Sequence, residues 1–163
     1  MSSSPSKQVY GVVMDYILSN ADIAKTFKPM NITRYDKPTH NKYPFKQDLA
    51  PADLPDLILQ LTSVVPNRHS SGEYVEIYNF QATITTGDWT LEQSVIAHVL
   101  MDWLIEANYN MMNGTDFGED YYFFKTEMLP MQVVNYMPDK NRNLSGHVYA
   151  IFFNIQVKRP RGV

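Results

Sequence analysis

Three residues in the sequence have the types found in a hydrolytic triad, namely Ser94, His98 and Asp102, and they are spaced four apart. In a triad the histidine takes the serine proton and the carboxylate orients the imidazole. The chemistry also needs free backbone N–H groups that face the oxyanion, and in the middle of a helix those groups are already hydrogen-bonded. A spacing of four places the three side chains in one row of a helix, where His98 and Asp102 can pair. We therefore interpret the row as a polar helix surface, and the chain as not an enzyme.

Other catalytic and cofactor chemistries find little support. Cysteine is absent, so the chain has no thiol nucleophile, disulfide or thiolate metal site. The remaining histidines are His40, His69 and His147. They are too far apart to show the short spacing of metal ligands, and the carboxylates crowded in residues 115–120 match no calcium loop. No glycine-rich phosphate-binding motif occurs, so we predict neither a metal nor a cofactor.

Charge and hydropathy limit the partners. The 14 Lys and Arg against 17 Asp and Glu give a formal charge of -3, which does not favour nucleic acid as the main ligand. No apolar run is long enough to span a membrane, and the first residues lack the apolar segment of a secretory signal, so no membrane partner is expected. A local basic surface remains a hypothesis, either as solvated loops or as a contact to DNA phosphates. Its residues would be Arg34, Lys37, Lys42, Lys46 and Arg68.

The polar row belongs to the clearest predicted helix, which runs from Thr90 to Asn110. Thr90 and Gln93 have the spacing of a capping box. Seven apolar residues fall on one arc that should face a core: Val95, Ile96, Val99, Leu100, Trp103, Leu104 and Ala107. Met101 and Ile105 project beside the polar row instead, so we interpret them as an interface with a partner, with ordinary core or single exposed apolar residues as the alternative.

Around this helix the chain predicts a single α+β domain over residues 1–163. An N-terminal helix covers Pro5–Ser19, and a short turn follows before Pro29. Residues 31–55 carry four prolines and predict an extended, irregular arm. Within the arm, Tyr43 and Phe45 have two equal interpretations, as contacts to a neighbouring subunit or as ordinary core or loose loop.

Alternation of apolar and polar residues predicts a four-stranded, mainly antiparallel sheet packed on the central helix of about residues 90–110. The expected strands are Leu57–Val64, Glu73–Thr86, Tyr122–Met137 and His147–Val157. The first two should form a hairpin, and a bulge near Asn79 would reconcile a change of phase in the second. The ends, residues 1–4 and 159–163, are predicted to be flexible.

The order of these elements carries a resemblance to a known family. The Thr-Leu-Glu-Gln that opens the central helix comes directly after the Phe-Gln-Ala-Thr-Ile of the second strand. Over about residues 54–158 the layout resembles the tail terminator and tail-completion proteins of tailed bacteriophages. The resemblance implies a structural protein of the virion neck, made in the host cytoplasm, with no active site.

The resemblance also implies partners. Copies of the chain would close into a ring, commonly of six subunits, that caps the tail tube protein, joins the neck or connector proteins, and has a possible passing contact with DNA in its channel. The interface residues we predict are Tyr43, Phe45, Arg68, Met101 and Ile105. The alternatives are a head-side connector, a stopper or another non-catalytic assembly adaptor, and third a small hydrolase that uses the polar row.

Overall fold

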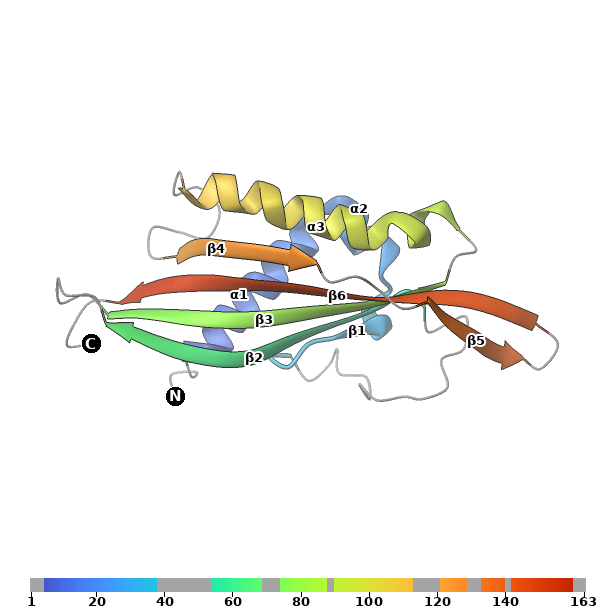
Figure 1. The fold of residues 1–163 in the computed structure, drawn as a ribbon, viewed down its shortest axis with the longest axis horizontal. Coiled ribbons are helices and arrows are strands. Elements are labelled where there is room, and N and C mark those ends of the chain that lie inside the picture. The colour runs from blue at the N-terminus through green and yellow to red at the C-terminus, as the bar shows by residue number, and fades with distance from the viewer. Residues whose placement is uncertain are drawn as a thin grey trace.

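The computed structural model describes residues 5–37, 54–68, 74–87, 90–112, 121–128, 133–139 and 142–159. These residues form an α+β fold, as predicted, in which helices pack on a largely antiparallel sheet (Figure 1). In chain order the elements are α1 (Pro5–Ser19), α2 (Ala21–Thr26), η1 (Pro29–Asn31), β1 (Ile32–Thr33), β2 (Asp56–Arg68), β3 (Tyr74–Gly87), α3 (Leu91–Met112), β4 (Tyr121–Met128), β5 (Val133–Asp139) and β6 (Arg142–Arg159).

The sheet follows the order β1-β2-β3-β6-β4, and β5 also pairs with β6. The described residues thus contain six strands instead of the four expected. The run predicted at 122–137 is divided into β4, which pairs with residues 151–157 of β6, and β5, which pairs with residues 142–147. Because β6 is 18 residues long, two shorter strands share its one side while β3 pairs along the other. The short β1 is parallel to β2, and the other pairings are antiparallel.

The core lies between one face of this sheet and the helices. Side chains alternate along each strand. On the helix-covered face they are buried: Leu57, Leu59, Tyr78, Phe80, Ala82, Ile84, Ile151, Phe153, Ile155 and Val157. Figure 1 shows α1 crossing behind the sheet and α3 running beside β4. The alternate residues point to the opposite face, where side chains such as Gln81, Thr83 and Gln156 are half-buried.

The bulge lies in a different strand from the one predicted. The pairing of β3 with β6 is unbroken, whereas the register of β2 shifts between Leu61 and Ser63. The Thr62 hydroxyl donates to the carbonyl of Asn79 at 3.0 Å, which places the irregularity of β2 opposite the predicted position. Ile77 therefore needs no bulge in its own strand, because it faces the side opposite the core.

The capping box of α3 is half confirmed. The N–H of Gln93 donates to the Thr90 hydroxyl at 3.2 Å, as predicted. The Gln93 side-chain oxygen does not turn back to Thr90 but accepts from the N–H of Gly87 at 2.9 Å. Gln93 is buried and thereby ties the end of β3 to the first turn of α3.

The buried stripe of α3 is rotated from the predicted arc. The buried residues are Gln93, Ile96, Ala97, Leu100, Leu104 and Ala107. Val95 was predicted to face the core and is exposed, while Val99 and Trp103 are only partly buried against it. Trp103 stacks on Tyr16 of α1, with ring centroids 5.2 Å apart. The stripe is displaced because α3 meets both the sheet and α1.

The segment predicted as an arm begins inside the folded domain. Within residues 31–55, β1 pairs with β2 and Arg34 is buried. Residues 38–53, which include Tyr43 and Phe45, lie outside the described residues. At the other end, β6 continues to Arg159, which is paired with Tyr74, so the strand extends into the tail predicted to be flexible.

Candidate functional site

The edge of β2 that faces away from β3 is covered by β1 along only part of its length. Beside Leu57 and Ile58 it is covered by β1. One residue further, the hydroxyl of Tyr10 donates to the Leu59 carbonyl at 2.6 Å and accepts from the N–H of Tyr35 at 3.1 Å. The phenol therefore bridges the two backbones at the point where they separate. Burial raises the pKa of Tyr10, so the phenol keeps its proton and remains a donor.

A buried arginine fixes the segment that follows β1. Arg34 is 3% exposed, and its Nε and Nη2 donate to the two carboxylate oxygens of Asp36, both at 2.7 Å. Nη2 also donates to Asp15 of α1 at 3.0 Å. Burial by itself would raise the pKa of Asp36, but the hydrogen bonds and positive charge of Arg34 outweigh it and hold that pKa below its ordinary value. We call Asp15, Arg34 and Asp36 the Arg34 cluster.

The cluster explains the glycine inside α1. A Cβ atom on Gly11 would lie 3.0 Å from Oδ2 of Asp36. A larger residue would push against the carboxylate that Arg34 holds, so this helix position accepts the weaker helix former. The close approach brings the segment after β1 directly onto α1.

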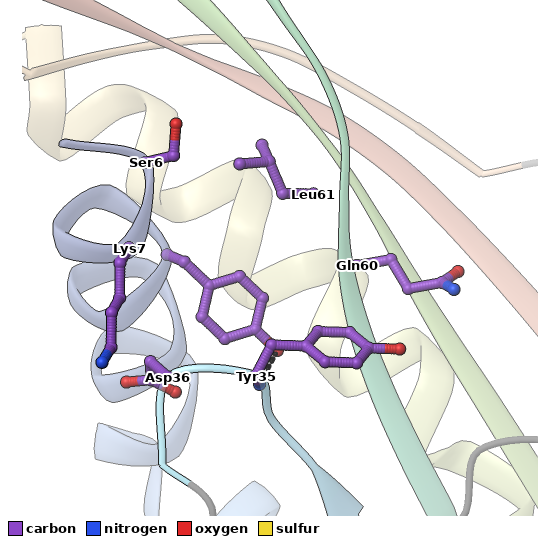
Figure 2. A pocket seen from close by; sticks show the side chains of 7 residues that line it. Ser6, Lys7, Tyr35, Asp36, Gln60 and Leu61 are labelled. Atoms are coloured by element: carbon purple, nitrogen blue, oxygen red, sulfur yellow. Dashed lines mark hydrogen bonds between the residues drawn. The ribbon is translucent and has the colours of Figure 1, made fainter. Parts of the chain in front are cut away.

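Beside the cluster the surface is hollowed. The hollow has a volume of about 440 Å³. It is lined by Ser6, Lys7, Tyr10, Tyr35, Asp36, Gln60 and Leu61. Figure 2 shows Ser6 and Lys7 on the α1 side, with Gln60 and Leu61 on β2. Tyr35 is 49% exposed, and its ring centroid lies 5.9 Å from that of Tyr10, so the hollow has an aromatic floor that reaches the surface.

Beyond Leu59, none of the described strands pairs with the outer side of β2. Residues 62–66 are exposed, and among them Val65 is 46% and Val64 is 37% exposed. An uncovered strand edge presents backbone donors and acceptors to which another chain can add a strand. We define the β2 edge site as Tyr35, Leu61, Val64 and Val65. It combines backbone hydrogen-bonding groups with apolar contact surface.

The predicted interface residues lie in different places. Ile105 is 45% exposed, as an interface residue should be, whereas Met101 is partly buried and packs against the core. Arg68 is the last residue of β2, next to the β2 edge site, and its side chain lies outside the described part, as do Tyr43 and Phe45. Figure 1 shows α3 beside β4 at one edge of the sheet and β2 towards the other edge, so the elements that carry Ile105 and Arg68 lie apart.

Two of the three triad residues, Ser94 and His98, make other contacts. The Ser94 hydroxyl donates to the Leu91 carbonyl of its own helix at 2.9 Å. The rings of His98 and Tyr149 pack in a T-shaped arrangement with centroids 5.9 Å apart, and His98 and Asp102 are both exposed. This arrangement forms no nucleophile and base pair. Whether the chain catalyses a reaction stays a prediction.

The hypothesis of a basic surface loses one of its residues. Arg34 is buried and paired with two carboxylates, so it cannot contact a phosphate. Lys37 is exposed and lies 4.0 Å from Asp15. Within the described parts of the chain, no three His, Asp or Glu side chains gather closely enough to hold a metal ion. None of the helices there has the length and apolar character needed to cross a membrane.

The β2 edge site as a whole does not follow from any local sequence pattern. One signal was present, because Pro66 follows the pair Val64-Val65 and a proline within a strand indicates an edge. The other half of the site, Tyr35, depends on a contact with α1 that no local pattern shows. No family model matches the chain, and no curated protein is detectably similar to it in sequence.

Proposed function

We propose that this chain is a structural protein of the neck of a tailed bacteriophage, which closes into a ring, ends the tail tube and joins it to the head-side connector. The observation that supports this most is the β2 edge site. Beyond Leu59, no strand among the described residues pairs with this edge, which carries apolar side chains and lies at the opposite edge of the sheet from the one beside α3. A surface of this kind suits contact with another chain better than it suits catalysis.

The mechanism we propose is ring closure by unlike patches. Each copy presents its β2 edge site to a different surface of the next copy, and the rotation repeats until the last copy meets the first. A closed ring leaves no free patch, so the same contact that builds the ring also ends growth. Backbone hydrogen bonds would supply much of the affinity, and Tyr35 and the valines would supply the choice of partner.

The face of the sheet away from the helices suits the channel of such a ring. Apart from the buried Asp56 at one end of this face, its described side chains are uncharged, and they include Ile58, Gln60, Asn79, Gln81, Thr83, Ala150, Phe152, Asn154 and Gln156. Neutral amides and hydroxyls would neither hold nor strongly repel phosphates. DNA could therefore pass without lasting contact.

Mass measurement in solution tests the proposal directly. For the purified full chain, sedimentation and light scattering should give about six times the monomer mass of 18.8 kDa, or about twelve times that mass if two rings pair, and electron microscopy should show rings. Val65→Lys should leave a folded protein that no longer forms them, because a buried unpaired charge is costly at an interface. Ala24→Lys, on the exposed side of α2, is the control and should leave the rings intact.

One result would refute the proposed ring, and a second would refute the interface assigned to it. The first is a chain that stays monomeric at all concentrations, which would favour the monomeric adaptor. The second is a ring that forms equally well with Val65→Lys, which would remove the β2 edge site from the interface.

A further inference from the structure

The outer side of α3 carries a second stripe, separate from the one that faces the core. Its members are Leu91, Val95, His98, Asp102 and Ile105, spaced alternately by four and three residues. All five are exposed, with Leu91 at 76% and Val95 at 39%. A spacing that averages 3.5 residues is the seam by which one helix packs along another. We call these residues the outer stripe.

The outer stripe is complementary to itself. Position 100 is equally far from Val95 and Ile105, and equally far from His98 and Asp102. If two copies of α3 lie antiparallel about a two-fold axis at this position, Val95 of each copy meets Ile105 of the other. In the same arrangement each His98 meets the other copy's Asp102. The two Val95–Ile105 contacts and the two His98–Asp102 contacts then form in the same arrangement.

Other arrangements leave a charge without a partner. A shift of one heptad in either direction places Asp102 opposite Leu91 or opposite Ile105, and burying a carboxylate against an apolar side chain costs several kcal/mol. A parallel pair places Asp102 opposite Asp102, which adds repulsion between like charges. The positions of His98 and Asp102 therefore select the antiparallel register.

The local contacts keep both polar groups available. The His98 ring packs against the Tyr149 ring and remains exposed, and an imidazole has an N–H to donate in either charge state. Ser94 does not compete for it, because its hydroxyl donates to the helix backbone. We infer that the outer stripe is a docking surface for a second copy of this chain, in which α3 pairs antiparallel with α3 around two His98–Asp102 contacts.

This contact is distinct from the ring proposed above. The β2 edge site lies towards one edge of the sheet, and α3 lies beside β4 at the other edge (Figure 1). Neither contact therefore blocks the other. A two-fold contact between identical patches makes pairs, whereas a contact between unlike patches makes rings. A chain that used both would give two rings stacked through two-fold axes. The α3 contact can also exist alone, as a dimer.

A charge exchange tests the pairing. In a Val65→Lys background, sedimentation equilibrium should show a monomer–dimer equilibrium. His98→Asp places two carboxylates opposite each other and should weaken it at least tenfold. Asp102→Lys removes the acceptor and should weaken the dimer by a similar factor. The double variant His98→Asp/Asp102→Lys restores one opposite pair at each contact and should recover most of the affinity.

The controls separate this result from damage to the fold. Ala24→Asp adds a negative charge to an exposed helix position outside the stripe and should leave the dimer unchanged. Circular dichroism melting should give similar curves for all the variants. A double variant as weak as the single ones, or a chain with no dimer at any concentration, would overturn the inference. Recovery in the double variant would support it, because only an antiparallel pair places residue 98 against residue 102.

Discussion

The two halves of β2 are covered in opposite ways. At Leu57–Leu59 the outer side is closed by β1 and by the Tyr10 hydroxyl, and the Arg34 cluster fixes the covering segment. From Gln60 to Pro66 no described strand covers it, and two valines are exposed. Both halves belong to one continuous strand paired with β3, so intrinsic strand preference does not explain the difference. The difference arises because tertiary contacts from β1 and Tyr10 cover only the first half.

From this contrast we expect the covered half of β2 to stabilise the fold and the open half to take part in assembly. In the closed half the Tyr10 hydroxyl and the Arg34 guanidinium are paired within the chain, so their loss should reduce the free energy of unfolding. In the open half the exposed groups have little to lose on unfolding, so changes there should affect assembly. Four predictions examine this division, from the largest effect to the smallest.

Replacing Arg34 by Ala should have the largest effect. The change leaves the carboxylate of Asp36 buried without its cation, and breaking a buried pair in this way costs about 3–5 kcal/mol. For a chain of this length that lowers the melting temperature by about 10 °C. Thermal melting followed by circular dichroism measures it. Lys37→Ala, which removes an exposed charge 4.0 Å from Asp15, is the control and should change stability by less than about 0.5 kcal/mol.

Lowering the pH should destabilise the fold through Asp36. Its pKa is below the ordinary value in the folded state, so it contributes stability above the unfolded pKa of about 3.9. That stability is lost as the pH falls through the folded pKa. Urea titrations at a series of acidic pH values measure the loss. In Asp36→Asn this part of the pH dependence should be missing, and an unchanged profile would show that the carboxylate is not responsible.

Tyr10→Phe should have a smaller effect. The ring remains, but the Leu59 carbonyl and the Tyr35 N–H lose their shared hydroxyl, at a cost of about 1–3 kcal/mol. Denaturant unfolding measures the change. Tyr35→Phe alters a half-exposed ring and should cost less than about 0.5 kcal/mol. Equal losses in the two variants would contradict a bridging role for the Tyr10 hydroxyl.

Much of the fold follows from local pattern, and α1, α3 and β6 show why. Asn20 caps α2, the short helix after α1, and its side chain accepts from the N–H groups of Asp22 and Ile23, a local signal of the kind that a sequence shows. The alternation in residues 147–157 is long enough to define a strand face. The division of residues 122–137 was missed, because two strands that share one partner look like a single extended run.

The candidate site was harder to predict, because its parts are distant in sequence. From the sequence, Arg34 is expected to be a charged residue of an exposed loop. Only the fold shows that two carboxylates surround it. Val95 reads as core from helix periodicity alone, but the direction of the buried stripe depends on how α3 meets α1 and the sheet. Periodicity gives the existence of a face, whereas tertiary packing decides which residues lie at its margin.

Val65→Thr should have the smallest effect on stability and still alter assembly. The change keeps a β-branched shape on an exposed strand residue, so the free energy of unfolding should move by less than about 0.5 kcal/mol. At the β2 edge site it replaces a methyl group by a hydroxyl that must be buried when two copies meet, which should raise the concentration needed to form rings several-fold. Light scattering across a dilution series measures that concentration, alongside a thermal melt of the same sample. A lower melting temperature with unchanged assembly would show that Val65 stabilises the fold and does not contact another copy. The two halves of β2 would then both serve stability.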